Sequence, residues 1–113
     1  MNVSVVVRHM EVTDAMRSYA QEKASRLPRL FNGLQSAVIT LDLDAGDHLV
    51  EIVASASHKA VFIARQRGSD MYACVDQCIH KLKQQLRRHK DRVRDRQAPG
   101  HDQTMVPERP PEQ

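Results

Sequence analysis

Aromatic residues are scarce in this chain of 113 residues, which contains two Phe, two Tyr and no Trp. A platform that stacks several splayed nucleobases on aromatic rings is therefore poorly supported. The four glycines stand singly, so there is no Gly-rich phosphate loop. No segment approaches the ~20 apolar residues of a membrane span, and the first residues lack the basic and apolar regions of a secretory signal. We expect a cytoplasmic protein with no membrane partner.

Cysteine and histidine do not assemble a recognisable catalytic or metal site. Cys74 and Cys78 stand four residues apart, a spacing that can hold a metal on a helix, and His80 is close in sequence. Both cysteines fall on an apolar stripe while His80 points away from it, so we interpret them as reduced thiols in the core. Candidates for nucleophilic catalysis are dispersed along the chain, and Ser57-His58 in a predicted turn is one example. The sequence thus predicts no metal, cofactor or small-molecule substrate, and an enzyme that uses His58 or the cysteine pair is an alternative.

Four short segments rich in β-branched or alternating apolar residues predict strands. They are residues 2–8, 37–44, 49–56 and 60–67. Turn residues at 45–47 and 57–59 separate the last three, which predicts an antiparallel meander.

Two amphipathic segments predict helices. The first runs from Asp14 to Leu27, with Thr13 as the N-cap and Pro28 closing it. The second follows an N-cap at Asp70 and repeats apolar residues at helical spacing over four turns.

The predicted order of elements is β-α-β-β-β-α. Two apolar stripes must be buried, and one face of a four-stranded sheet can cover both, so we predict an α+β two-layer sandwich. Residues 1–96 form the single domain. Residues 97–113 contain four of the five prolines and few apolar residues, which is typical of a disordered tail.

Basic residues are concentrated in the second helix, although the net charge of the chain is only +3. Residues 81–96 contain eight Lys or Arg against two acids. Solvated helix faces usually interleave the two signs, whereas Arg87-Arg88-His89-Lys90 places like charges together. Clustered cations suit a nucleic acid or another polyanion. With the helices side by side, Lys23, Arg26 and Arg29 of the first would merge with this run. An anionic membrane surface fits less well, because the apolar stripe is already required by the core.

Two stretches of the chain carry a family resemblance. Asp70-Met71-Tyr72-Ala73 is followed by Lys81-Leu82-x-x-Gln85-Leu86 and by Arg88-His89-Lys90-Asp91. Upstream, the segments 12–17 and 23–27 fit the first helix of the same family. In these residues the chain resembles the ribosome hibernation-promoting factors, also called the ribosome-associated translation inhibitor family, over residues 1–96. The short form is the closer match, since long forms add a C-terminal dimerisation domain.

The resemblance implies a non-enzymatic factor, a monomer when free, that is made under stress or in stationary phase. It would bind the 30S small subunit, alone or within the 70S ribosome, in the channel where mRNA and the A- and P-site tRNAs sit. By occupying this channel it would inhibit translation. Contacts to 16S ribosomal RNA are implied by matched position for Lys23, Arg26, Lys81, Arg88 and Lys90, and the charge cluster adds Arg87, Arg92 and Arg94. A double-stranded RNA-binding module is the alternative, although its usual α-β-β-β-α order lacks the first strand.

Overall fold

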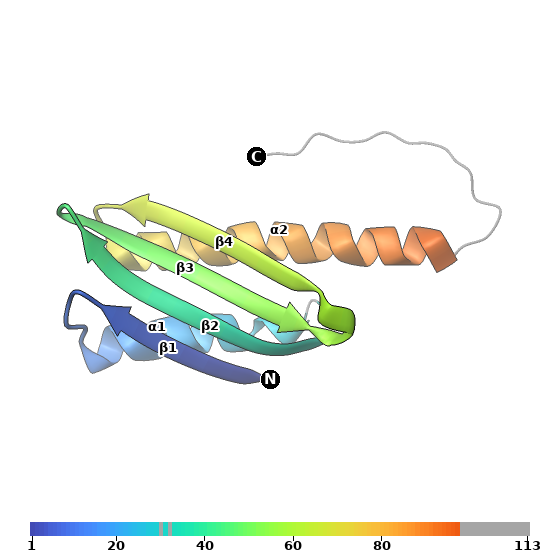
Figure 1. Cartoon of the computed structure of the whole chain (residues 1–113), viewed down its shortest axis with the longest axis horizontal. Coiled ribbons are helices and arrows are strands. Elements are labelled where there is room, and N and C mark those ends of the chain that lie inside the picture. Colours follow the sequence, from blue (N-terminus) through green and yellow to red (C-terminus); the bar gives the residue numbers. More distant parts are fainter. Residues whose placement is uncertain (30, 32, 98–113) are drawn as a thin grey trace.

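A computed structural model describes residues 1–97 of the chain except residues 30 and 32, and without the side chains of His58 and of residues 93–97. The order β-α-β-β-β-α confirms the predicted sequence of strands and helices (Figure 1). The elements are β1 (Asn2–Arg8), α1 (Asp14–Ser25), the 3-10 turn η1 (Leu27–Arg29), β2 (Leu34–Asp44), β3 (Asp47–Ala56), the 3-10 turn η2 (Ser57–Lys59), β4 (Val61–Gly68) and α2 (Met71–Gln97). The predicted tail lies outside the described residues, apart from Gln97, which belongs to α2.

The four strands form one mixed sheet in the order β1-β2-β3-β4. β2, β3 and β4 are antiparallel neighbours, which confirms the meander, whereas β1 pairs with β2 in parallel. Parallel neighbours need a crossover connection, and α1 provides it. One row across the sheet runs Val5, Ile39, Ile52, Ala64. These side chains belong to or pack against the core, so the row marks the face that is covered.

Both helices cover that same face of the sheet, which confirms the two-layer sandwich. Figure 1 shows α1 behind β1 and β2, and α2 behind β3 and β4. Ala20 and Ala24 of α1 and Leu82 and Leu86 of α2 have an exposed fraction of 0%. Full burial of a Leu side chain contributes ~1.5–3 kcal/mol. The apolar stripes therefore hold the helices to the sheet and leave their outer sides to solvent.

The end of α1 differs from the prediction. The helix stops at Ser25, two residues before Leu27, and Arg26 is its C-cap, donating its backbone N–H to the carbonyl oxygens of Ala24 and Lys23. The α-helical conformation is disfavoured for a residue that precedes a proline, so Pro28 restricts the backbone of Leu27 as well as its own. The chain continues as the 3-10 turn η1 with Leu27 buried.

The turn between β2 and β3 is tighter than predicted, whereas β4 begins at Val61, one residue later than predicted. Ala45 and Gly46 have φ values of 51° and 83°, the pair of positive angles that a two-residue type I′ hairpin needs. Asp47 therefore already pairs with Asp44 and begins β3 two residues earlier than expected. At the next turn, Lys59 has a φ of 64°. β2 begins at Leu34, three residues before its predicted start.

The second helix begins where its capping residue predicts. The Asp70 carboxylate accepts a hydrogen bond from the backbone N–H of Tyr72 at 3.1 Å, and its carbonyl accepts one from Cys74 at 3.0 Å. The 27 residues of α2 make it about 40 Å long. Its last buried residue among those described is Leu86. Figure 1 shows the C-terminal part of α2 extending past the ends of the strands.

Candidate nucleic-acid interface

The two helices run in the same direction, so their C-terminal ends lie toward the same end of the molecule (Figure 1). They touch through Tyr19, whose hydroxyl donates a hydrogen bond to Asp76 at 2.6 Å. The Tyr19 and Tyr72 rings also meet edge to face, with centroids 5.0 Å apart. These contacts set α1 beside the first turns of α2, so the two helices are neighbours, as the sequence predicted.

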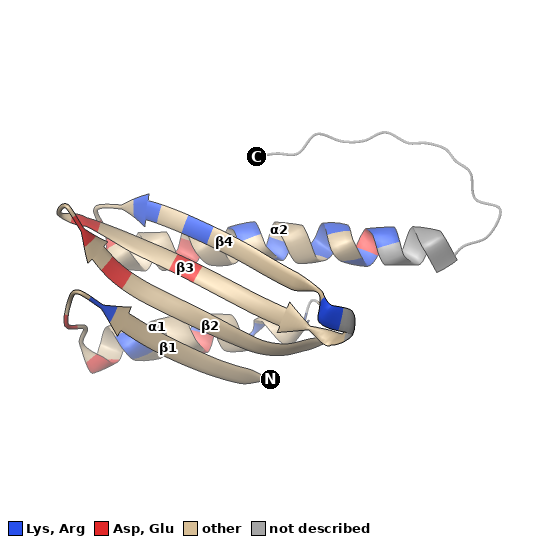
Figure 2. Cartoon of the chain, viewed as in Figure 1, with Lys and Arg blue, Asp and Glu red and all other residues tan. Residues whose placement is uncertain are grey.

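Positive charge is concentrated on the second half of α2 (Figure 2). Lys81, Arg87, Arg88, Lys90 and Arg92 are all exposed on this helix. The side chain of Arg94 lies outside the described ones. Acidic residues gather instead at the opposite end of the sheet, around the β2–β3 hairpin (Figure 2). The molecule is therefore polarised along its length.

The two expected residues of α1 also lie on its surface. The ammonium of Lys23 sits 5.3 Å from the centre of the Tyr19 ring, a cation–π distance, and its side chain is half-buried. Arg26 is exposed and forms an i,i+4 ion pair with Glu22 at 3.0 Å. An exposed pair of this kind contributes ~0.2–1 kcal/mol, so a phosphate can readily replace Glu22.

Lys81 has a structural contact that the sequence did not suggest. Its ammonium donates a hydrogen bond to the carbonyl oxygen of Arg65 at 2.7 Å. One turn further along, the Gln85 amide donates to the carbonyl oxygen of Ile63 at 2.7 Å. Both carbonyls belong to β4, the outer strand of the sheet. Lys81 and Gln85 therefore attach α2 to this free edge, and no local signal in the sequence could have indicated it.

The opposite edge of the sheet has a similar attachment. The Arg17 guanidinium of α1 donates a hydrogen bond to the carbonyl oxygen of Val5 in β1 at 3.3 Å. Side chains from both helices thus reach over the two outer strands.

His89 interrupts the basic run because it faces inward. Its ring lies 5.2 Å from the Phe31 ring and 5.2 Å from the Phe62 ring, both in edge-to-face geometry. The chain has only these two Phe residues. Phe62 belongs to the core and Phe31 packs against it, so neither contributes to an exposed stacking platform. Lys83, Arg87 and Lys90 make no ion pair with another described side chain, and they are exposed around the inward-facing His89.

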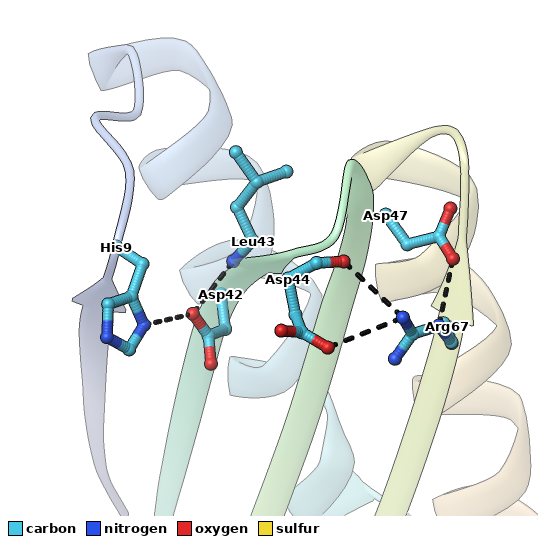
Figure 3. Close-up of polar contacts among 6 residues, drawn as sticks. All are labelled: His9, Asp42, Leu43, Asp44, Asp47 and Arg67. Carbon is cyan, nitrogen blue, oxygen red and sulfur yellow. Dashed lines mark hydrogen bonds and ion pairs between the residues drawn. The ribbon is translucent and has the colours of Figure 1, made fainter.

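The arginines of β4 are engaged with acids instead. Arg67 contacts Asp47 at 2.9 Å and Asp44 at 3.4 Å (Figure 3). Arg65 pairs with Glu51 at 2.8 Å. The hydrogen bond to Asp47 raises the pKa of Arg67 further above its ordinary range. The charges of these arginines are therefore offset within the sheet, which leaves α2 as the main cationic surface.

The same hairpin end holds a histidine–carboxylate pair. His9 Nδ1 lies 2.9 Å from Asp42 Oδ1, and the Asp42 carboxylate also accepts the backbone N–H of Leu43 at 2.8 Å (Figure 3). The hydrogen bond from His9 lowers the pKa of Asp42 below its ordinary value.

The two cysteines lie in the core, as predicted. Cys78 is fully buried and its thiol contacts the Val50 carbonyl at 3.3 Å; burial raises the pKa of this thiol to about 12. Cys74 is also buried, and burial raises its pKa as well. A protonated, inaccessible thiol is a poor nucleophile and a poor metal ligand. Among the described residues, no group of three His, Cys, Asp or Glu could hold a metal ion. His80 is exposed, and the side chain of His58 lies outside the described ones.

Within the part of the chain that the structure describes, no helix has the length and apolar character needed to cross a membrane.

Solved structures of other proteins share this fold. The chain superposes on the Thermus thermophilus Protein Y N-terminal domain with a TM-score of 0.71 and 29% sequence identity, over 79% of this chain and 99% of that one. A ribosomal subunit interface protein from Coxiella burnetii gives a TM-score of 0.74 at 21% identity, over 80% of this chain and 99% of that one. The second likeness is one of fold alone.

Curated relatives match most of the chain. The ribosome hibernation promoting factor of Azotobacter vinelandii is 34% identical over 97 residues, covering 86% of this chain and 90% of the relative. That of Salmonella typhimurium is 28% identical over 94 residues, covering 83% and 98%. The ribosome hibernation promotion factor of Staphylococcus aureus is 31% identical over 99 residues, but the match spans only 52% of that relative. This pattern of coverage is consistent with the predicted resemblance to the short form.

A family model described as Sigma 54 modulation protein / S30EA ribosomal protein matches residues 3–94, which comprise all four strands and both helices except the first residue of β1 and the last three residues of α2. With this match and the Azotobacter relative, the resemblance predicted from the helix motifs is confirmed, and the chain belongs to the Sigma 54 modulation protein / S30EA ribosomal protein family.

Proposed function

We propose that this protein is a cytoplasmic, non-enzymatic ribosome hibernation factor that inhibits translation by occupancy under stress or in stationary phase. It binds the 30S small subunit, alone or within the 70S ribosome, in the channel used by mRNA and by the A- and P-site tRNAs. The observation that carries the proposal is the basic half of α2, which extends past the sheet and whose described cations are exposed (Figures 1 and 2). Relatives whose sequences match 86% and 83% of this chain are named ribosome hibernation promoting factors, which supports the ribosome as the partner.

The ligand in this proposal is the phosphate backbone of 16S ribosomal RNA. A-form RNA is recognised mostly by its shape and backbone, and clustered Lys and Arg suit such recognition without reading bases. The contacting residues are Lys23, Arg26, Lys81, Arg87, Arg88, Lys90, Arg92 and Arg94. The Lys81 ammonium has three N–H donors and uses one of them to bond to β4, so the other two can contact a phosphate.

Sedimentation with purified ribosomal particles tests the partner. The protein is mixed with 30S, 50S or 70S particles at low and at high salt and separated on sucrose gradients. We expect co-migration with 30S and 70S at low salt, loss at high salt, and no binding to 50S. Protein that stays at the top of the low-salt gradient would overturn the proposal.

Competition tests the site and the mechanism. Excess tRNA and a short mRNA should displace the protein from 30S subunits, because all three occupy one channel. An equal phosphate concentration of free duplex RNA should not displace it. Comparable displacement by the duplex would favour a double-stranded RNA-binding module instead.

A further inference from the structure

The sheet has one face that the helices leave uncovered, and Figure 1 shows it in front of both helices. Side chains alternate between the two faces of a strand, so the residues next to the buried ones point away from the helices. The register sets these residues in rows across all four strands. One row consists of Ser4, Val38, Val53 and Ile63, and the row beside it of Asn2, Ser36, Ser55 and Val61. Half of the uncovered face is thus made of uncharged residues.

An apolar patch lies on this half of the face. Among the described residues six large apolar side chains are exposed, and four of them belong to the uncovered face: Val6, Val38, Val61 and Ile63, with exposed fractions of 43%, 38%, 54% and 43%. Val53 stands between Val38 and Ile63 and is half-buried. We name Val38, Val53, Val61 and Ile63 the sheet patch. A contiguous apolar patch rimmed by polar residues is typical of a binding surface.

The other half of the same face holds its charged residues. The acids are Asp42, Asp44, Asp47 and Glu51, and the arginines are Arg8, Arg65 and Arg67. Figure 2 shows the acids on β2 and β3. Arg65 pairs with Glu51 at 2.8 Å and Arg67 with Asp47 at 2.9 Å. This face therefore has one more acid than it has arginines, whereas the outer side of α2 is strongly basic.

We propose that the uncovered face of the sheet binds a basic protein of the small ribosomal subunit, whose apolar side chains cover the sheet patch. This inference rests on the proposed function and deepens it, because it gives each layer of the sandwich its own partner. The slight excess of acid complements a basic protein surface. RNA fits this face poorly, since the sheet patch offers neither a cation for phosphate nor an aromatic ring for a base.

The size of the patch favours this partner over a second copy of the chain. Two rows across four strands span roughly 19 Å by 13 Å at the usual strand spacings, or about 250 Å² in projection. A stable interface buries about 800 Å² on each partner. The sheet patch is therefore too small to hold two free molecules together. It suffices as a second contact for a protein that its helices already hold on the ribosome.

A patch variant with Val38→Thr, Val61→Thr and Ile63→Thr tests the contact. Threonine keeps the β-branched shape that suits a strand, and all three side chains are exposed, so the midpoint of urea unfolding should stay unchanged. Val6→Thr is the matched control, because Val6 is equally exposed on the same face but stands in the row of Thr40, Glu51 and Arg65.

The first readout is affinity for purified 30S subunits over a range of salt concentrations. The patch variant should bind roughly tenfold more weakly, as expected when contacts at the centre of an interface are lost. Its log-log salt slope should equal that of the wild-type protein, because no cation has been removed. The control should bind within about twofold of the wild-type protein.

The second readout identifies what covers the patch. A benzophenone side chain placed at position 63 is activated by light in complexes with purified 30S subunits, and the cross-linked product is identified by mass spectrometry. We expect a cross-link to a small-subunit protein of net positive charge.

The outcomes separate this inference from the proposed function. Wild-type affinity of the patch variant, or a cross-link to 16S ribosomal RNA, to a second copy or to nothing, would overturn the inference while binding to 30S subunits upholds the ribosome as the partner. A shallower salt slope for the patch variant would also overturn it, because the patch would then lie against phosphates. If the wild-type protein fails to bind 30S subunits, the proposed function is wrong and the inference falls with it.

Discussion

Replacing Tyr19 with Phe removes one hydroxyl group at the contact between the two helices. The hydroxyl lies 2.6 Å from Asp76, while the ring keeps its edge-to-face contact with Tyr72. The substitution therefore removes a hydrogen bond to a carboxylate and little apolar contact. Tyr72→Phe is the matched control, because it deletes the same group from a side chain whose hydroxyl bonds to no other described residue.

The expected loss follows from the kind of bond. Hydrogen bonds to charged groups contribute about 1.5–3 kcal/mol, and a position that water partly reaches lies below that range, so we expect about 1 kcal/mol. For a domain of this size that lowers Tm by about 4–8 °C. Tyr72→Phe should change the free energy of unfolding by less than about 0.5 kcal/mol.

Urea unfolding of the two variants gives the test. A double-mutant cycle with Asp76→Asn should return a coupling energy of about 1 kcal/mol between Tyr19 and Asp76. Equal stability of Tyr19→Phe and Tyr72→Phe, or a coupling near zero, would refute the contact between the helices.

Alkaline titration provides a second measure of the same bond. The hydrogen bond to Asp76 and burial raise the pKa of Tyr19 from 10.0 to about 12. The folded state thus holds the proton more tightly than the unfolded chain, so this contribution to stability is fully present below pH 10 and is lost as pH rises toward 12. The chain has two Tyr, so Tyr72→Phe leaves only Tyr19 to titrate. Tyrosinate absorbance with a midpoint near 10 in the folded protein would contradict the contact.

Three further results are expected. Gln85→Leu, which removes the donor to Ile63, should lower the free energy of unfolding in urea by about 1 kcal/mol, whereas Gln84→Leu on the same helix should stay within about 0.5 kcal/mol; equal losses would mean that the bond to β4 contributes nothing. Cys74 and Cys78 should resist a thiol reagent in the native protein and both react in urea, and rapid native labelling would place them outside the core. Ribosome affinity should fall with salt at a log-log slope of roughly −4 to −7, and a flat response would contradict backbone recognition.

The elements that sequence reasoning found are those with a local signal. Thr13 and Asp70 begin the two helices, and each accepts a hydrogen bond from the first turn. Such capping depends only on neighbouring residues, so the sequence suffices to predict it. The exact end of α1 was harder to predict, because it depends on how Pro28 restricts the residue before it. Leu27 can be buried in the core from a 3-10 turn as well as from an α-helix, so its apolar character did not reveal where the helix ends.

For the candidate site, the sequence predicted which cations lie on the surface of α2 but not how these side chains contact the sheet. Helical periodicity places Arg87 and Lys90 off the apolar stripe, and both are exposed. The bond from Lys81 to Arg65 joins residues 16 apart across two elements. It depends on how far α2 is displaced toward β4, which is a property of the packed molecule. The same holds for Arg67, whose charge is offset by Asp44 and Asp47 only because the β2–β3 hairpin brings them to it.

Both outer strands of the sheet present backbone carbonyls that another chain could pair with, and unpaired strand edges are the usual starting point of aggregation. In this protein Arg17 occupies the Val5 carbonyl on one edge, and Lys81 and Gln85 occupy two carbonyls on the other. Under the proposed function, a factor that occupies its target must be present in amounts comparable to that target, because mass action sets the bound fraction. The long side chains that cross the edges discourage strand-to-strand association, which the proposed function would require, because the protein would have to reach a high concentration without aggregating.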